Sequence, residues 1–154
     1  MKSYFIYSSK IGEIYIAGEK DFITDVGFGS IDHKINETEI IHKTYIQLDE
    51  YFNGKRKSFD IPLRIEGTPF QEAVWHVLLT IPYGETRSYK DTAEQIGRPN
   101  ACRAVGNANN KNKISIIIPC HRVIGANGSL AGYGGGLEIK KKLLEIERKY
   151  QNSR

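Results

Sequence analysis

The chain has 154 residues and a formal net charge of +4 at pH 7, a size that suits one domain or two small domains sharing an interface. No apolar run approaches the roughly 20 residues that span a bilayer, and the first residues lack the apolar core of a signal peptide, so we expect a cytoplasmic or nuclear setting. Two cysteines and four scattered histidines exclude a disulfide framework and a zinc site, and we expect neither a metal nor a cofactor.

The charge is divided unevenly along the chain. Residues 1–69 carry nine Lys and Arg against eleven Asp and Glu, a balance of −2, whereas residues 70–154 carry thirteen against seven, a balance of +6. No acidic residue lies between Glu94 and Glu138, an interval that holds Arg98, Arg103, Lys111, Lys113 and Arg122. A polyanion is a natural partner for this half, although a basic surface that serves only solubility would look the same.

The first third of the chain predicts a small β-sheet and one helix. Residues 4–7, 14–17 and 22–28 are strand-like, and residues 9–12 predict a turn. Apolar side chains then recur at helical spacing, in a helix that Gly54 ends: Ile41, Tyr45, Leu48 and Phe52. The charged residues 55–60 predict a connection to a second part of the molecule.

From Thr68 onward the pattern becomes helical. Thr68, Pro69 and Gln71 supply a cap, a first-turn proline and a capping-box glutamine for a helix that residues 81–84 stop. Its expected buried stripe is Phe70, Val74, Val77 and Leu78. A second, weaker capping box at Ser88 opens a short helix that Gly97 ends.

A third helix is expected from Pro99 or Asn100 to about Asn109. Its small apolar residues share one face: Ala101, Ala104, Val105 and Ala108. The opposite face carries one cation, two amides and a gap, with no acid: Arg103, Gly106, Asn107 and Asn110. Two helices joined by a glycine turn and presenting such a face indicate a DNA-binding helix-turn-helix, with a plain helical hairpin as the alternative.

The most informative segment is Pro119-Cys120-His121-Arg122-Val123, which follows the apolar run 114–118. A thiol is a strong nucleophile only as the thiolate, and an adjacent histidine and a nearby arginine can both favour that form. A buried structural cysteine that happens to precede a histidine is the alternative interpretation.

The last part of the chain holds a glycine-rich segment and a helix. Six glycines between residues 125 and 136 predict tight turns or the close approach of a ligand. Residues 137–150 then predict an amphipathic helix with a buried face made of Ile139, Leu143, Ile146 and Tyr150. Glu147 lies at the edge of that face, where a carboxylate either finds a partner or reaches out to solvent.

With its Pro-Cys-His-Arg-Val segment placed after a helix-turn-helix, the chain resembles the O6-alkylguanine-DNA alkyltransferases. Ordered blocks carry the resemblance: residues 81–84, 88–89, 103–106, 118–123 and 132–137, with Asn112, Leu143, Leu144 and Glu147. The first 65 residues match only in general pattern. The resemblance implies an α+β fold, in which a small N-terminal αβ domain (residues 1–66, an RNase H-like sheet plus helix) precedes a mostly helical C-terminal domain (residues 67–154) with a winged-helix-like helix-turn-helix.

The resemblance also implies roles for individual residues. Cys120 would accept the alkyl group, His121 would activate it through a water, and Glu147 would orient that histidine. Tyr89 would assist departure of the guanine, and Arg103 would enter the base stack in place of a flipped nucleotide. The expected DNA contacts are Ser88, Arg103, Gly106, Asn107, Asn110 and Arg122, and the expected pocket and its support are Asn112, Pro119, Tyr133, Gly134 and Gly135.

Two of these pocket and support residues carry a further expectation. Asn112 would tie the helix-turn-helix to the active-site strand. Gly134 stands where many relatives have a serine, so its backbone N–H would take over the contact to the guanine oxygen.

The implied activity is direct-reversal repair by a methylated-DNA–protein-cysteine methyltransferase. An alkyl group would pass irreversibly, once per molecule, from O6-alkylguanine or O4-alkylthymine in duplex DNA to Cys120 after nucleotide flipping. We expect a monomer that needs no cofactor and no membrane, cytoplasmic or, in a eukaryote, nuclear. The alternatives are a non-catalytic lesion-sensing or regulatory helix-turn-helix protein and a cysteine hydrolase; the acid-free helix face argues against the hydrolase.

Overall fold

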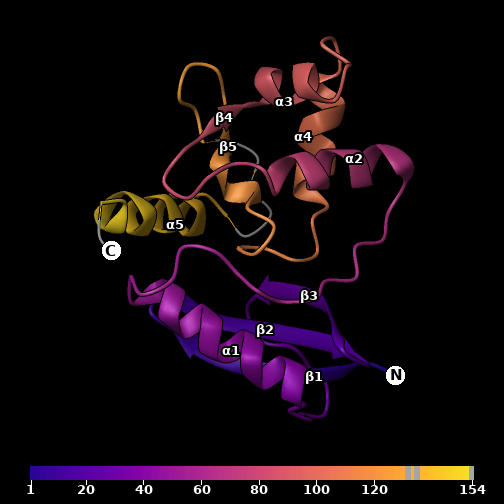
Figure 1. The fold of residues 1–154 in the computed structure, drawn as a ribbon, viewed down its shortest axis with the longest axis vertical. Helices are drawn as coiled ribbons and strands as arrows, with labels where there is room; N and C mark the ends of the chain where they lie inside the picture. Colours follow the sequence, from indigo (N-terminus) through magenta and orange to yellow (C-terminus); the bar gives the residue numbers. More distant parts are fainter. Residues whose placement is uncertain (131–132, 134–135, 153–154) are drawn as a thin grey trace.

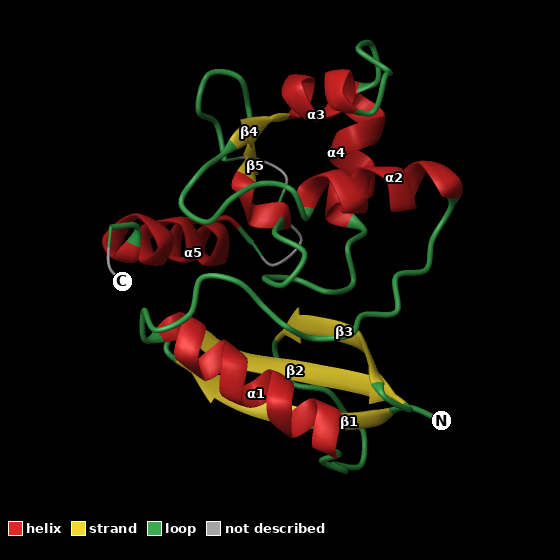
Figure 2. Cartoon of the chain, in the orientation of Figure 1, coloured by secondary structure: helices red, strands yellow, loops and turns green. Residues whose placement is uncertain are grey.

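The structure, a computed structural model, describes residues 1–130, 133 and 136–152. The N-terminal strands and the first helix form one part of the molecule, and the remaining helices gather on the other side (Figure 1). The predicted α+β architecture is confirmed, with a small sheet and one helix followed by a mostly helical part (Figure 2). None of the helices within the described ranges is long and apolar enough to cross a membrane.

The N-terminal sheet is an antiparallel meander in the order β1 (Ser3–Ser9), β2 (Gly12–Glu19) and β3 (Phe22–Phe28). Its helix, α1 (Glu39–Phe52), is capped by the Thr38 side chain, which accepts a hydrogen bond from Ile41 N. The helix lies across the sheet (Figure 2). The predicted stripe is buried at Ile41, Leu48 and Phe52. The wholly buried Ile14 and Ile16 of β2 complete this half of the core.

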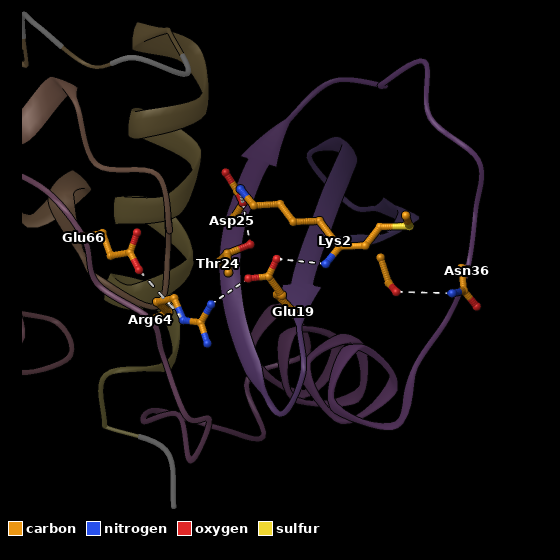
Figure 3. Close-up of polar contacts among 9 residues, drawn as sticks. Lys2, Glu19, Thr24, Asp25, Asn36, Arg64 and Glu66 are labelled. Atoms are coloured by element: carbon orange, nitrogen blue, oxygen red, sulfur yellow. Dashed lines mark hydrogen bonds and ion pairs between the residues drawn. The ribbon is translucent and has the colours of Figure 1, made fainter.

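The segment after α1 runs along the edge of β3. Ile23 N donates to Pro62 O at 3.0 Å, and Arg64 N donates to Ile23 O at 2.9 Å. The Arg64 side chain adds an ion pair with Glu19 at 2.7 Å and a longer one with Glu66 at 4.0 Å (Figure 3). Because partly exposed pairs contribute about 0–1 kcal/mol each, the backbone bonds are the firmer attachment of this segment.

The helical part contains α2 (Pro69–Leu78), α3 (Tyr89–Gln95), α4 (Cys102–Asn110) and α5 (Leu137–Tyr150), with two short parallel strands, β4 (Arg87–Ser88) and β5 (Val123–Ile124). Both predicted capping boxes are confirmed: Thr68 with Gln71 opens α2, and Ser88 with Asp91 opens α3. Gly97 ends α3 with a φ of 77°, a left-handed conformation that favours glycine.

The predicted buried face of α4 is partly wrong. Val105 and Ala108 are buried, but Ala104 is exposed, because it lines an open groove shared with Phe70 and the start of α2. Asn109 is 2% exposed instead, and its amide donates to the Cys120 carbonyl at 3.2 Å. That hydrogen bond satisfies the amide nitrogen, whereas the buried Oδ1 has no partner among the described residues.

The strand implied before Cys120 is also wrong. Only Ile114 forms a β-bridge, with Val26 of β3, and the residues that follow it turn instead. Ile116 has a φ of 72°, which is costly for a β-branched residue and incompatible with a regular strand. The bridge joins the two parts of the molecule, since Val26 N donates to Lys113 O at 2.9 Å and Ser115 N donates to Val26 O at 2.9 Å.

Candidate active site

A single turn of 3-10 helix, η1 (Cys120–Arg122), carries the predicted Cys-His-Arg segment into the core. Cys120 is 3% exposed, and the His121 ring is fully buried. Two amides hold the chain on either side of Pro119, because Asn112 Nδ2 donates to Ile118 O at 2.9 Å and Asn109 Nδ2 donates to Cys120 O. Asn112 therefore supports the segment as expected, although what it supports is a turn.

Glu147 of α5 lies directly beneath this turn and is 1% exposed. Its Oε2 lies 2.6 Å from His121 Nε2, so the expected pairing of these two residues is confirmed in the geometry. Arg122 donates to the same carboxylate through Nε at 2.8 Å and Nη2 at 3.0 Å, and through Nη1 to Ile81 O at 2.7 Å. No sequence pattern predicts this bidentate pair.

Arg122 is therefore not a DNA-contacting residue, contrary to the prediction from its charge. It is 6% exposed, and its guanidinium faces inward onto Glu147 and Ile81. Arg122 neutralises the buried carboxylate. A count of basic residues along the sequence cannot distinguish such a buried cation from a surface charge.

The cluster fixes the protonation pattern of the pair. Burial alone would raise the pKa of Glu147, but His121 and Arg122 hold it well below its usual range, so the carboxylate is ionised. Burial, together with the charges of Arg122 and Lys140, lowers the pKa of His121 although Glu147 acts to raise it, so the imidazole is neutral. A neutral imidazole beside an ionised carboxylate donates through Nε2, which leaves Nδ1 as a proton acceptor with no hydrogen-bond partner among the described residues.

Cys120 opens onto a cavity of about 270 Å³ between the two parts of the molecule. The N-terminal part contributes residues of β2 and β3, and the C-terminal part contributes residues around the turn; the lining includes Tyr15, Gly27, Phe28, Asn112, Ser115 and Tyr133. Burial raises the pKa of the Cys120 thiol, while hydrogen bonds with Asn112 and Tyr133 and the charge of Lys140 act in the opposite direction. The thiolate therefore depends on its polar neighbours.

Lys140 is a site residue that the sequence did not reveal. It is fully buried, donates to Val123 O at 2.7 Å, and lies 5.9 Å from the ring centre of Tyr89 and 5.8 Å from that of Tyr133. Within the described residues no carboxylate pairs with it, and burial lowers its pKa to about 8. It shares the buried face of α5 with Leu143 and Glu147. In the sequence Lys141 and Lys142 follow it, and such a run is typical of a solvated helix face.

Tyr51 of α1 is the second residue that the sequence did not reveal. Its hydroxyl donates to Glu147 Oε2 at 2.6 Å, and the side chain is fully buried. Its position on the apolar face of α1 predicts a core residue, and no local pattern connects it with a residue 96 positions later.

The predicted DNA face is exposed on α4 at Arg103, Asn107 and Asn110, and this helix carries no acidic residue. Gly106 is half-buried beside the Tyr89 ring, where an added Cβ would meet ring carbons at 3.8 Å. Ser88 caps α3, so its side chain already accepts a hydrogen bond from Asp91 N.

Three further residues predicted for the site, Tyr89 as a catalytic residue and Pro119 and Tyr133 as pocket residues, also lie near Cys120. Tyr89, the first residue of α3, is half-buried, and burial followed by the charge of Cys120 raises its pKa. Pro119 is buried and Tyr133 lines the cavity. Gly134 and Gly135, the remaining predicted pocket residues, lie outside the described residues.

A thiol beside a histidine–carboxylate pair, next to an acid-free helix-turn-helix face, is the arrangement of a DNA-binding protein with a nucleophilic cysteine. Comparison with known proteins agrees with this class. The family model described as 6-O-methylguanine DNA methyltransferase, ribonuclease-like domain, matches residues 2–65, and the one described as 6-O-methylguanine DNA methyltransferase, DNA binding domain, matches residues 69–149.

Individual relatives match over nearly the whole chain. A methylated-DNA–protein-cysteine methyltransferase of Methanosarcina acetivorans is 50% identical, with 94% of this chain and 97% of that protein covered. The constitutive methylated-DNA–protein-cysteine methyltransferase of Bacillus subtilis is 47% identical, with 96% of each covered. The crystal structure of Mycobacterium tuberculosis OGT in complex with DNA superposes with a TM-score of 0.90 at 47% identity, covering 96% of this chain and 94% of that one. The chain belongs to the 6-O-methylguanine DNA methyltransferase family.

Proposed function

We propose that this protein repairs alkylated duplex DNA by direct reversal, moving the alkyl group of O6-alkylguanine or O4-alkylthymine onto the sulfur of Cys120. The observation that carries the proposal is the position of Cys120, at the cavity and one residue from the buried His121–Glu147 pair. Membership of the family and the exposed acid-free face of α4 support DNA as the partner.

The reaction is a displacement at carbon. The Cys120 proton passes to His121 Nδ1 through a bridging water, as the family resemblance implies, while Glu147 keeps Nε2 protonated. A bond then forms between Sγ and the alkyl carbon as the bond from that carbon to guanine O6 breaks, and the electron pair leaves with the base. The guanine anion takes up a proton, for which the Tyr89 hydroxyl is the proposed donor.

The outer surface of the helical part is the proposed binding surface for DNA. Arg103 is the residue we propose to fill the stack when the damaged nucleotide flips out, which offsets part of an unstacking cost of a few kcal/mol. Asn107 and Asn110 lie one and two turns further along the same face of α4. The exposed cations Arg98, Lys111 and Lys113 are the proposed phosphate contacts in place of Arg122. A lesion can arise in any sequence, so we expect little base preference around it.

The product is a thioether at Cys120. Removing the alkyl group again would require the Cys120 thiolate to leave from carbon, and a thiolate is a poor leaving group there, so each molecule reacts once and serves as both catalyst and acceptor. We propose that it does so as a monomer in the cytoplasm, or in the nucleus of a eukaryote. The division into an N-terminal domain (residues 1–66) and a DNA-binding and alkyl-transfer domain (residues 67–154) belongs to the same proposal, and the meeting of the two family matches between residues 65 and 69 supports it.

The test is intact mass after mixing the protein with a duplex that carries one O6-methylguanine. We expect a gain of one methyl that saturates at one per molecule, its loss in Cys120→Ser, and its retention in the matched control Cys102→Ser. Tight lesion binding without a gain would make the protein a lesion sensor, and equal binding to damaged and undamaged duplex would make it a regulator. Repeated turnover would contradict the stoichiometric reaction.

A further inference from the structure

The N-terminal part of the molecule reaches the His121–Glu147 pair through one side chain. Tyr51 stands near the end of α1, and its hydroxyl donates to Glu147 Oε2 at 2.6 Å. The distance is the same as that from His121 Nε2 to the same oxygen. A short bond to an ionised acceptor is a strong one, and here neither partner is open to water.

The Glu147 carboxylate is surrounded by donors. Oε2 accepts from Tyr51, His121 and Arg122, and Oε1 accepts from Arg122 Nε and from the backbone N–H of Gly84 at 3.2 Å. Four of these five contacts come from the C-terminal part of the chain. Tyr51 is the exception, and because it shares Oε2 with the imidazole it acts on the oxygen that faces His121.

The ring of Tyr51 is held so that its hydroxyl cannot easily turn elsewhere. It packs against Phe52, Phe59 and Tyr83 at centroid distances of 5.3, 5.6 and 6.1 Å. Burial, reinforced by the charge of Glu147, raises the pKa of Tyr51 well above its usual value, so the hydroxyl stays protonated and can only donate to the carboxylate.

We propose that Tyr51 is a positioning residue for alkyl transfer, which fixes Glu147 Oε2 on His121 and limits how strongly that oxygen draws the imidazole proton. This inference rests on the proposed function. A neutral donor on Oε2 takes up part of the negative charge that the oxygen would otherwise direct at His121 Nε2–H. Without it, the imidazolium is better stabilised, so His121 releases its proton at higher pH and is protonated more often at neutral pH.

The groups that face His121 and Glu147 within the described residues are few. Arg122 lies on the carboxylate, and Lys140 of α5 lowers the pKa of His121 by its charge. Tyr83, on the loop after α2, and Tyr133 both interact with the charge of Glu147. None of them takes the place of the Tyr51 hydroxyl on Oε2, and the Tyr83 hydroxyl is buried without a hydrogen-bond partner in the described part of the chain.

Tyr51→Phe therefore removes one hydrogen bond and keeps the ring, and Tyr83→Phe is its matched control. Both variants and the wild type would be mixed with excess duplex carrying O6-methylguanine, and the maximal single-turnover rate and the duplex affinity would be measured across the range in which histidine titrates. For Tyr51→Phe we expect a fall of about tenfold in the maximal rate at neutral pH, an acid limb displaced to higher pH, and unchanged affinity. Tyr83→Phe should match the wild type.

Wild-type behaviour in Tyr51→Phe would overturn the inference, as would an equal loss in Tyr83→Phe or a loss confined to affinity. If Tyr51→Phe does not fold, 3-fluorotyrosine at position 51 keeps the hydroxyl and makes it a stronger donor. The acid limb of the rate profile should then move to lower pH, and an unchanged acid limb would contradict the role of Tyr51. A wild-type protein that fails to methylate Cys120 would instead overturn the proposed function, so the two failures are distinguishable.

Discussion

The two parts of the molecule contribute to the site in different ways. The C-terminal part holds the proposed nucleophile, its histidine, the ion-paired carboxylate and the DNA face. The N-terminal part holds none of the groups that would react, yet Tyr51 bonds to the carboxylate, and β3 forms one wall of the Cys120 cavity. A region without reacting groups can still govern a reaction, by fixing the orientation of a charge and the width of a pocket.

The largest expected effect is at the carboxylate that the two parts share. Glu147→Gln leaves Arg122 buried without its charge partner and His121 without an ionised acceptor. We expect the transfer rate to fall by about a hundredfold or more, and the free energy of unfolding to fall by about 3–5 kcal/mol. Single-turnover kinetics and urea unfolding measure both, with the exposed Glu145→Gln as control.

This stability difference has a defined pH dependence. The pKa of Glu147 is lower in the folded protein than in the unfolded chain, so its contribution is present above the unfolded pKa and is lost as the pH falls through the folded one. The wild type should therefore lose its advantage over Glu147→Gln on acidification. If the difference in free energy of unfolding between the wild type and Glu147→Gln stayed constant in acid, the carboxylate would not be ionised as we infer.

The next largest effect is expected at the DNA face. Arg103→Ala should slow transfer from a damaged duplex by about tenfold to a hundredfold, because the flipped nucleotide loses its replacement in the stack. Transfer from the free base O6-benzylguanine, which needs no flipping, should be unchanged. Equal losses on both substrates would place Arg103 in the chemistry rather than in flipping.

An effect of about tenfold is expected from the buried cation beside Cys120. Lys140→Met keeps an unbranched side chain, one atom shorter, and removes the charge near the thiolate and the two tyrosine rings, so the transfer rate should fall by about this factor. The exposed Lys141→Met is the control.

The free energy of unfolding should also depend on pH through Lys140. Since burial lowers the pKa of Lys140 to about 8, the unfolded chain binds more protons above that value, and this residue makes stability rise with pH until about its unfolded pKa. Lys140→Met should lack that rise. If Lys140→Met transferred the alkyl group as fast as the wild type, the charge of Lys140 would have no part in the reaction.

The smallest effect is expected at the wall that β3 supplies. Phe28 lines the cavity, and its ring lies 6.1 Å from that of Tyr133. Phe28→Ala should widen the slot and raise the rate for O6-benzylguanine relative to O6-methylguanine in DNA by about threefold or more. The control is Phe22→Ala, at the exposed start of the same strand, and an unchanged ratio would mean that this strand does not limit adduct size.

Residues with local signals were predictable, and those joined only by the fold were not. The capping boxes at Thr68 and Ser88 are patterns four residues long, and both are confirmed. The pairing of His121 with Glu147 came from a family resemblance rather than from spacing. Tyr51 stayed hidden because its partner is 96 residues away, and Lys140 because two further lysines follow it.

Arg122 shows a different limit of the sequence. The sequence shows the charge of Arg122 but not whether its side chain faces solvent or the core. The side chain faces the core because Glu147, 25 residues later, lies there in the folded chain. The same applies to Ala104 and Asn109. Helical periodicity predicts that Ala104 is buried, but in the packed helix α4 Ala104 is exposed and Asn109 is buried.

The central claim is that the alkyl group leaves the DNA and remains on Cys120. It is tested most directly with a duplex whose O6-methylguanine carries a deuterated methyl group, by quantifying restored guanine in the DNA and locating the label in the digested protein. We expect equal amounts of restored guanine and of labelled Cys120, up to one per molecule. Restored guanine without label on Cys120, or label on Cys102, would contradict it.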